Sequence, residues 1–416
     1  MAIFAATLVT FGALTADTNA ALTITINESG GDIVATYSGT LNSWGQTKYK
    51  VDSPGVSRFH GGMRKARWLA EWAGKQGKPA IYHCVSRVVD RRFVFGDGER
   101  EHFRMFMRMQ ENFTGCRVLT YCVMSNHFHV LLEVPPAPEG GITDGLLLKR
   151  LAALYSDGFV AGVAMELAGA RKDGDEALAA EIHARFTYRM HDLSEFMKTL
   201  LQRFTRWFNR THERSGTLWE QRYKSVIVES GVAARTMAAY IDLNPVRAGM
   251  VSDPADYRWS GYGEAVGGGA KGNGRKSREG IVRVCLSHKG TGFEAESWKE
   301  VSQIYRRAMG LALGRKSGRA AVGMPGHATK NEAEMLESGD NGTVLPDLGM
   351  AGMLSRRVRY FTDGAVIGSK GFVNDAFADG RWRFTEKRQD GARRMRGSGA
   401  QARGVLWSIR DLRVGV

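Results

Sequence analysis

Two histidines separated by one residue are the part of this chain whose type and spacing point most directly to chemistry. His127 and His129 stand in the run Met-Ser-Asn-His-Phe-His-Val-Leu-Leu-Glu, residues 124–133. In a β-strand alternate side chains share a face, so both imidazoles would project together while Phe128 projects the other way. Two imidazoles on a rigid sheet can hold one divalent metal ion, and such an ion can bind a phosphate. A packing role is the usual explanation of an isolated pair.

A tyrosine and an asparagine four residues apart form a second pair. Tyr240 and Asn244 share one face of a predicted helix, and the Asn244 amide oxygen is a candidate third metal ligand. An Asn-Pro pair also commonly ends a helix, which is the alternative. The usual pKa of a tyrosine is about 10, which makes Tyr240 a weak nucleophile. A metal-bound phosphate accepts charge, and the phenol could then attack in line to give a phosphotyrosine and a 3′ hydroxyl.

The elements that must position these four side chains follow an α+β order. Alternating apolar residues predict strands, and apolar residues repeating every three or four positions predict helices. In chain order we expect a strand 80–88, a helix 98–112, a strand 116–123, a strand 127–134, a helix 191–209, a strand after Gly216 and a helix 232–243. This order predicts an antiparallel sheet with helices packed on one face, and a hairpin that holds the two histidines near its turn.

Composition favours a nucleic acid as the partner. The 416-residue chain has a formal net charge of +15, so a polyanion is expected, although a basic protein with no such partner would look the same. No basic amphipathic anchor stands out, so we expect no membrane partner. The four cysteines have no zinc-ligand spacing and indicate a reducing compartment, the cytoplasm. They are Cys84, Cys116, Cys122 and Cys285.

Basic and aromatic side chains between the hairpin and the tyrosine are candidate DNA contacts. One side of the helix 191–209 is basic, and the segment after it has rings that could stack on bases. The candidates are Arg203, Arg206, Arg210, Trp219, Arg222, Tyr223 and Lys224. A solvated helix face is the alternative for the arginines, and a core position is the alternative for Trp219. His83 and His212 show no such pattern, and we assign them no function.

The N-terminal segment differs from the rest of the chain. Residues 1–62 form a weakly charged leader, in which an apolar run precedes a predicted β-strand that starts at Leu22. No Lys or Arg precedes the apolar run, as a signal peptide would require. We interpret the leader as a fused or mis-started reading frame with Met63 as a plausible original start. A secreted protein is the alternative.

The predicted catalytic domain is residues 63–266, with an insertion inside it and two further segments after it. Residues 137–185 form an insertion of one or two surface helices, residues 267–274 a Gly-rich linker, and residues 275–416 a basic C-terminal extension. Within the extension, residues 354–377 predict either a helix-turn-helix that reads DNA or a plain helical hairpin. Arg393, Arg394 and Arg396 lie among glycines and predict a flexible arm that contacts phosphates.

Four motifs resemble those of REP-associated tyrosine transposases and follow one another along the chain in the same order as in that family. These transposases belong to the HUH superfamily of single-tyrosine nucleases. His127-Phe128-His129 resembles the His-hydrophobic-His motif, and residues 240–249 resemble the tyrosine helix. The stretches 217–225 and 253–262 agree as well. The resemblance extends over roughly residues 79–265 apart from the insertion, and four motifs in order make it far more specific than two histidines alone.

The resemblance implies a ferredoxin-like HUH core with His127 and His129 as metal ligands, Tyr240 as the nucleophile and Asn244 as a third ligand. It also implies Mg²⁺ or Mn²⁺ as cofactor, single-stranded or hairpin DNA as partner, and a monomer or homodimer. We therefore expect a metal-dependent single-strand DNA nuclease and strand transferase that acts at hairpins through a 5′-phosphotyrosine. A catalytically silent protein that binds structured DNA and a phosphodiesterase that uses water are the alternatives.

Overall fold

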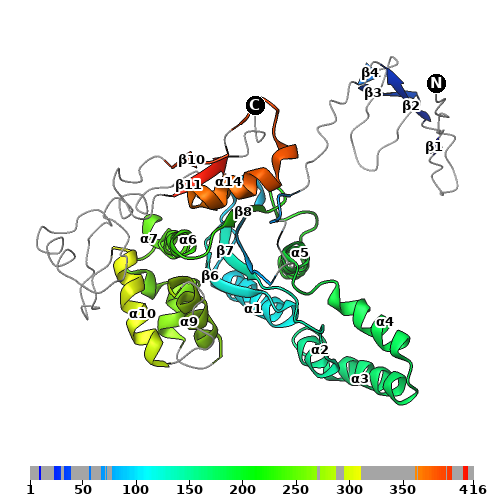
Figure 1. Ribbon diagram of the computed structural model, residues 1–416, viewed down its shortest axis with the longest axis horizontal. Helices are drawn as coiled ribbons and strands as arrows, with labels where there is room; N and C mark the ends of the chain where they lie inside the picture. Colours follow the sequence, from blue (N-terminus) through cyan, green and yellow to red (C-terminus); the bar gives the residue numbers. More distant parts are fainter. Residues whose placement is uncertain are drawn as a thin grey trace, which may run out of the picture. The chain divides into compact units, whose positions relative to one another are not determined.

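The computed structural model divides the chain into two units, residues 1–67 and residues 68–416 (Figure 1). The described residues of the first unit form a sheet of four strands, β1 (Val9–Thr10), β2 (Thr23–Ser29), β3 (Asp32–Ser38) and β4 (Val56–Ser57). β2 confirms the strand predicted after Leu22 and pairs antiparallel with β3. Apart from these strands, the structure describes residues 67–70, 72, 77–268, 272–286, 295–310, 361–362, 364–389, 391–395 and 406–410.

The second unit contains a seven-stranded sheet in the order β10-β11-β9-β8-β5-β7-β6. The pairs within it are antiparallel except for β8 and β9, which run parallel. The α+β class and the largely antiparallel sheet are therefore confirmed. The strands are β5 (Ala80–Arg87), β6 (Arg117–Val123), β7 (His127–Val134), β8 (Lys224–Val228), β9 (Gly364–Gly368), β10 (Arg393–Arg394) and β11 (Trp407–Arg410).

Helices cover both faces of this sheet, where we expected one (Figure 1). On one face Phe128 of β7 packs against Phe103 of α1 (Asp97–Thr114), which contacts Phe204 of α5 (Leu193–Thr211). On the other face His129 meets Tyr240 of α6 (Val232–Asp242). The physical reason is visible in β7 itself, because residues 128–134 are buried on both sides and a two-sided strand needs two covering layers.

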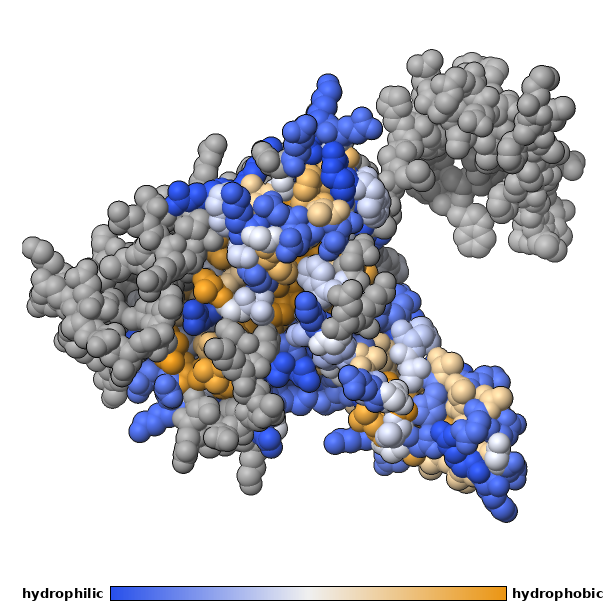
Figure 2. All heavy atoms as spheres, viewed as in Figure 1, coloured by the Kyte–Doolittle hydropathy of each residue, from blue (hydrophilic) through white to orange (hydrophobic). Residues whose placement is uncertain are grey.

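The insertion contains three helices, where we expected one or two. They are α2 (Asp144–Leu151), α3 (Asp157–Lys172) and α4 (Glu176–Thr187). The break between the last two falls at Gly174, whose φ is +68°, and Asp175 then accepts a hydrogen bond from the Leu178 amide to cap α4. These helices share a small apolar core with Phe113 of α1. Figure 2 shows pale apolar patches among the hydrophilic side chains of these insertion helices.

The predicted linker 267–274 does not separate the C-terminal extension from the core. α8 (Gly261–Gly267) is followed closely by α9 (Gly272–Cys285), which packs against β6. The close approach depends on Gly280, because a Cβ there would lie 2.4 Å from the Leu119 carbonyl oxygen. Glycine is the residue that allows a backbone to come this near. The packed core therefore continues into the part of the chain that we expected to be a separate extension.

The described part of the extension is also different from the prediction. β9 and α14 (Lys370–Asp379) follow each other where a helix-turn-helix was considered, and β9 joins the central sheet beside β8. Arg393 and Arg394 form β10, paired with β11, in place of a flexible arm. Residues 354–360 and Arg396 lie outside the described residues. No signal of alternating apolar residues marked these short strands in the sequence.

Five further elements lie within the described residues. They are η1 (Val89–Arg91), α7 (Asn244–Arg247), η2 (Pro254–Asp256), α10 (Ala295–Ala308) and η3 (Arg381–Arg383). In the part of the chain that the structure describes, none of the helices has both the length and the apolar character needed to cross a membrane.

Candidate active site

The β6–β7 hairpin positions the two predicted metal ligands. His127 opens β7 directly after the turn, where its carbonyl accepts a hydrogen bond from the Met124 amide at 2.8 Å. His129 lies two residues further along the same face, opposite Val85 of β5 and Cys122 of β6. The two imidazole ring centres are 5.1 Å apart, with the rings nearly perpendicular. The alternation predicted from the sequence therefore brings both rings to one face of the strand.

A third histidine, His83 of β5, contacts His129 from the neighbouring strand. His83 Nδ1 lies 2.7 Å from the Phe361 carbonyl oxygen, and His83 Nε2 lies 2.9 Å from His129 Nδ1. A carbonyl oxygen can only accept, so we infer that His83 Nδ1 donates and that His83 Nε2 accepts from His129. This order leaves the lone pair of His129 on Nε2, the atom a metal ion would need.

Burial keeps this pair of histidines neutral, which the inferred hydrogen-bond order requires. Burial lowers the pKa of His83 to about 4. Burial, and then the neighbouring His83 and His127, lower the pKa of His129 well below its usual value. His129 is only 3% exposed. Neutral imidazole is the form that can bind metal ions.

His127 is oriented in the same sense by its neighbour in the turn. Asn126 Oδ1 lies 2.7 Å from His127 Nδ1, and Asn126 Nδ2 donates to the Arg91 carbonyl oxygen at 2.8 Å. The second bond fixes which end of the Asn126 amide faces the histidine, so His127 Nδ1 is the protonated nitrogen. The lone pair of His127 is then on Nε2, as it is in His129.

Helix α6 brings Tyr240 to the same place. The Tyr240 ring centre lies 6.1 Å from that of His129 and 6.5 Å from that of His83. The Arg247 guanidinium stacks over the Tyr240 ring at 4.2 Å and donates to the Tyr240 carbonyl oxygen at 2.6 Å. Phe361 covers another side, with ring centres 4.6 Å apart. These contacts leave the tyrosine 2% exposed.

Asp242, two residues after the tyrosine, fixes α6 to the fold. Its carboxyl group accepts hydrogen bonds from the Thr120 hydroxyl of β6, from the Tyr262 amide of α8 and, at 2.6 Å, from the Tyr305 hydroxyl of α10. The side chain is fully buried, and burial raises its pKa to about 7. One carboxyl group thus ties the tyrosine helix to three other elements.

Asn244 lies where α6 ends and α7 begins. Its Nδ2 donates to the carbonyl oxygens of Tyr240 and Ile241, at 3.3 and 3.1 Å, so the amide nitrogen caps the last turn of α6. The capping role that we considered for an Asn-Pro pair is therefore present. It is compatible with a ligand role, because the bonds use only Nδ2 and Asn244 also lines the pocket described next.

All four predicted catalytic and metal-binding residues line one pocket of about 500 Å³. The pocket wall is strongly basic, with Glu220 as the acidic residue among those that line it. Its cationic side chains are Arg87, Arg91, Arg222, Lys224 and Arg247. A concave site lined by imidazoles, a phenol and this many cations is suited to an anionic substrate such as a phosphodiester.

The predicted DNA contacts are divided by the structure. Arg222 and Lys224 line the pocket. Arg203, Arg206 and Arg210 lie on α5, which covers the opposite face of the sheet, and Tyr223 is buried. Trp219 packs against Phe95, Phe128 and Phe204, and its Nε1 donates to Thr205, which is the core position considered as the alternative.

Three residues of the site were missed by sequence reasoning. His83 could have been found from strand pairing, since it lies diagonally across from His129 on the same face. Arg247 stands in the tyrosine motif, but its stacking on the ring depends on the turn between α6 and α7. Phe361 is 278 residues from its partner His83, and no local pattern marks it.

Comparison with known proteins gives an independent view of the hairpin. Residues 78–139 match the family model described as "Transposase IS200 like". This stretch, called the IS200-like segment below, is similar to that transposase family. The match spans β5, α1, β6 and β7, so it includes both histidines and ends before Tyr240. The predicted resemblance to a transposase family is confirmed for this part of the chain.

One solved structure to which the chain is similar is that of a REP-associated tyrosine transposase bound to a REP hairpin. The alignment covers 47% of this chain and 83% of that one, at 14% sequence identity and a TM-score of 0.30. No curated protein sequence matches the chain.

The donors in the pocket suit a divalent metal ion whose other ligands are water or phosphate oxygens. Within the described ranges, no three His, Cys, Asp or Glu side chains form a metal-binding group of their own. The available set is two imidazoles, both with the lone pair inferred on Nε2, and an amide oxygen. Such an incomplete set leaves coordination positions for a substrate, as catalytic metal sites do.

Proposed function

We propose that this protein is a metal-dependent single-strand DNA nuclease and strand transferase that acts at hairpin-forming sequences through a 5′-phosphotyrosine. The observation that carries the proposal is the convergence of His127, His129, Tyr240 and Asn244 on one basic pocket. The IS200-like segment accounts for the hairpin alone. It is the packing of α6 against β6 and β7 that adds the tyrosine.

The histidines would bind Mg²⁺ or Mn²⁺ through Nε2, with Asn244 Oδ1 as the third ligand. A metal ion bound there would withdraw charge from a phosphodiester and make its phosphorus easier to attack. His83 and Asn126 hold the two rings in the tautomer that this binding needs. Partners of this kind, which contact a ligand but not the metal, commonly determine metal affinity.

Tyr240 would supply the nucleophile. As its Oη forms a bond to phosphorus, the bond from phosphorus to the 3′ oxygen breaks, the phenol loses its proton and the 3′ oxygen gains one. Arg247 stacks on the ring, so its guanidinium lies beside the side chain that would attack. Arg222 and Lys224 would bind the phosphates on either side of the cut. Rejoining would reverse these steps with another 3′ hydroxyl.

A second candidate, a catalytically silent protein that binds structured DNA, is favoured by the burial of the tyrosine. Tyr240 is 2% exposed and packs between Phe361 and the Arg247 guanidinium. An active enzyme must therefore open this packing when DNA arrives. A silent protein would bind hairpin DNA with a strong dependence on salt. It would not cut this DNA, whichever metal ion is present.

Formation of a covalent adduct distinguishes these candidates. The full chain should be incubated with Mn²⁺ and labelled hairpin DNA taken from inverted repeats that flank the gene, and the products separated in denaturing gels. The proposal predicts a DNA–protein adduct that Tyr240→Phe abolishes. Cleavage without an adduct would indicate a phosphodiesterase that uses water, and binding with neither product would indicate the silent protein.

A further inference from the structure

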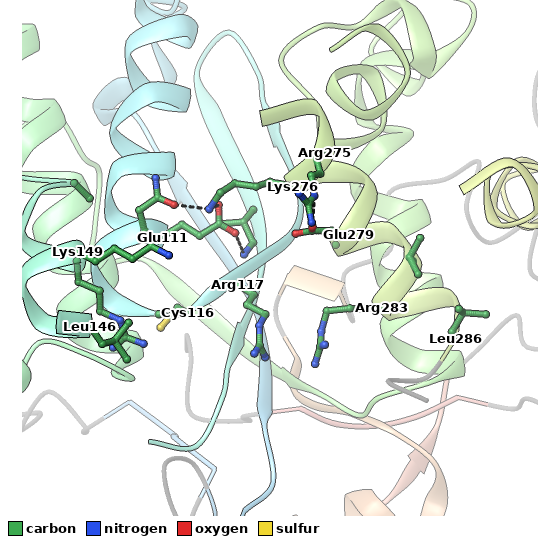
Figure 3. Close-up of a pocket in the computed structure, with 17 residues that line it drawn as sticks. Glu111, Cys116, Arg117, Leu146, Lys149, Arg275, Lys276, Glu279, Arg283 and Leu286 are labelled. Carbon is green, nitrogen blue, oxygen red and sulfur yellow. Dashed lines mark hydrogen bonds and ion pairs between the residues drawn. The ribbon is translucent and has the colours of Figure 1, made fainter. Parts of the chain in front are cut away.

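A second pocket, of about 840 Å³, lies at the opposite end of the β6–β7 hairpin from the histidines (Figure 3). Its walls come from the end of α1, the start of β6, the insertion helix α2 and the C-terminal helix α9. None of its lining residues belongs to the tyrosine pocket. The two segments that we expected to lie outside the catalytic core therefore build this cavity together.

The lining of this second pocket has a large excess of positive charge. Its cationic side chains are Arg117, Lys149, Arg150, Arg275, Lys276 and Arg283. Its two carboxylates already have partners, since Glu111 accepts from Arg108 and from the Val118 amide, and Glu279 pairs with Arg275. The net charge of the lining favours an anion.

Two arginines are held side by side at the β6 wall. Arg117 of β6 and Arg283 of α9 both donate to Glu133, at 2.5 and 2.9 Å, and Figure 3 shows their side chains next to each other. Glu133 is fully buried, while Arg117 and Arg283 are partly exposed. Each guanidinium has five N–H donors, more than one shared carboxylate can accept. This pair presents a fixed, forked donor set of the kind that phosphates prefer.

The insertion contributes two more cations from α2. Lys149 is exposed, and within the described residues it forms no ion pair. Arg150 is half-buried over Gly115, where its guanidinium contacts Met190 Sδ and His191 Nε2 at 3.2 and 3.1 Å, with no carboxylate among these partners. Because Arg150 also lies at the C-terminal end of α1, part of its role is to complement the helix dipole. Lys149 is therefore the better probe of the pocket.

We propose that this second pocket binds backbone phosphates of DNA, at a site separate from the tyrosine pocket. DNA is favoured over a single free anion because six cations spread over three elements match a row of phosphates better than one. The charge of the whole chain, +15, favours the same partner. The inference needs DNA binding but does not depend on Tyr240 being a nucleophile. It gives the insertion and α9 a joint function, which is to bind a part of the DNA that is distant from the cleavage site.

The test compares two exposed lysines of the insertion. Lys149 lies inside the pocket, and Lys172 lies outside it, at the end of α3. Neither forms an ion pair within the described residues. Lys149→Gln and Lys172→Gln remove the same charge from the same lobe of the full chain. Affinity for a fluorescein-labelled DNA hairpin with single-stranded flanks is measured by anisotropy at several salt concentrations. Arg283→Gln is a second pocket variant.

Loss of one phosphate contact should reduce the slope of log affinity against log salt by about 0.7 to 0.9. We expect this change for Lys149→Gln and Arg283→Gln, and a slope equal to that of the unchanged chain for Lys172→Gln. Equal slopes for all variants would overturn the inference. It would also be overturned if inorganic pyrophosphate weakened DNA binding while the substitutions left the affinity for DNA unchanged. Absence of the tyrosine adduct in the unchanged chain would count against the proposed function and leave this inference intact.

Discussion

His83 Nε2 lies 2.9 Å from His129 Nδ1, so a histidine of β5 orients the predicted metal ligand of β7. The Phe361 carbonyl oxygen, 2.7 Å from His83 Nδ1, sets the direction of both hydrogen bonds. Donation runs from His129 at the candidate metal site, through His83 in the centre of the sheet, to the Phe361 carbonyl oxygen in the C-terminal part of the chain. We therefore infer that His83 is a positioning residue, since it contacts His129 but does not line the tyrosine pocket.

Replacing His83 should weaken metal binding without removing a ligand. His83→Phe keeps an aromatic ring but loses the acceptor for His129 Nδ1, so we expect the affinity for Mn²⁺ to fall about 10- to 100-fold. Titration calorimetry of the full chain measures this affinity directly. His83→Gln, whose amide can both donate and accept, should recover part of the loss.

The matched control for this prediction is His212→Phe. His212 is an exposed histidine that forms a hydrogen bond with Glu99, 113 residues earlier in the sequence. Its Mn²⁺ affinity should be unchanged. The ¹⁵N chemical shifts of His129 should also report a protonated Nδ1, and a protonated Nε2 would contradict the inferred order of donors.

The buried carboxyl of Asp242 should make stability depend on pH. Burial raises its pKa to about 7 in the folded state, against about 3.9 for an unfolded chain. The stability associated with the neutral carboxyl is complete below about pH 4 and is lost as the pH rises through 7. Asp242→Asn cannot ionise, so the free energy of unfolding of the unchanged chain should fall relative to this variant between pH 4 and 7, by roughly 4 kcal/mol at most.

Urea unfolding at a series of pH values measures this difference, with Asp173→Asn as a control on an exposed aspartate at the end of α3. The control should parallel the unchanged chain throughout. A constant difference between the unchanged chain and Asp242→Asn over this pH range would mean that Asp242 is ionised in the fold, held by its three donors.

Gly280 should tolerate no side chain. A Cβ at this position would lie 2.4 Å from the Leu119 carbonyl oxygen, so Gly280→Ala must push α9 away from β6. We expect a loss of about 1 to 3 kcal/mol in the free energy of unfolding. Gly162→Ala in α3, where a Cβ meets nothing within 4 Å, should stabilise by about 0.5 to 1 kcal/mol. Thermal unfolding of both variants tests the contact, and similar shifts for the two would contradict it.

The two basic surfaces near the sheet should differ in their effect on DNA binding. Lys224 lines the tyrosine pocket, whereas Arg210 lies on α5 across the sheet. Lys224→Gln should therefore weaken binding of hairpin DNA and lower its salt dependence, and Arg210→Gln should leave both nearly unchanged. If Arg210→Gln has the larger effect in anisotropy measurements, DNA binds the α5 face, as the sequence first suggested.

Much of the site was predictable because its main parts are local motifs. Alternation in a strand places His127 and His129 on one face, and a four-residue spacing places Tyr240 and Asn244 on another, whatever the rest of the fold. The structure confirms that both pairs face one pocket. The order of strands and helices also predicted the class of the fold.

The parts that the sequence did not predict depend on contacts between distant segments. Phe361 reaches His83 across 278 residues because β9 joins the sheet beside β8, and a five-residue parallel strand has no pattern that distinguishes it from a loop. The glycines near 267–274 suggested a linker, although Gly280, a few residues later, serves close packing. A glycine-rich stretch is compatible with a flexible linker and with close helix packing. Only the position of α9 against β6 distinguishes the two.

The central claim is that Tyr240 attacks DNA while His127 and His129 hold the metal ion. It is tested most directly by mass spectrometry of the denatured adduct formed from the full chain, Mn²⁺ and labelled hairpin DNA. We predict one peptide, containing residue 240, that has gained the mass of a nucleotide 5′-phosphate, and no such peptide from Tyr240→Phe. A modified peptide that lacks residue 240, or an adduct that persists in Tyr240→Phe, would contradict the claim.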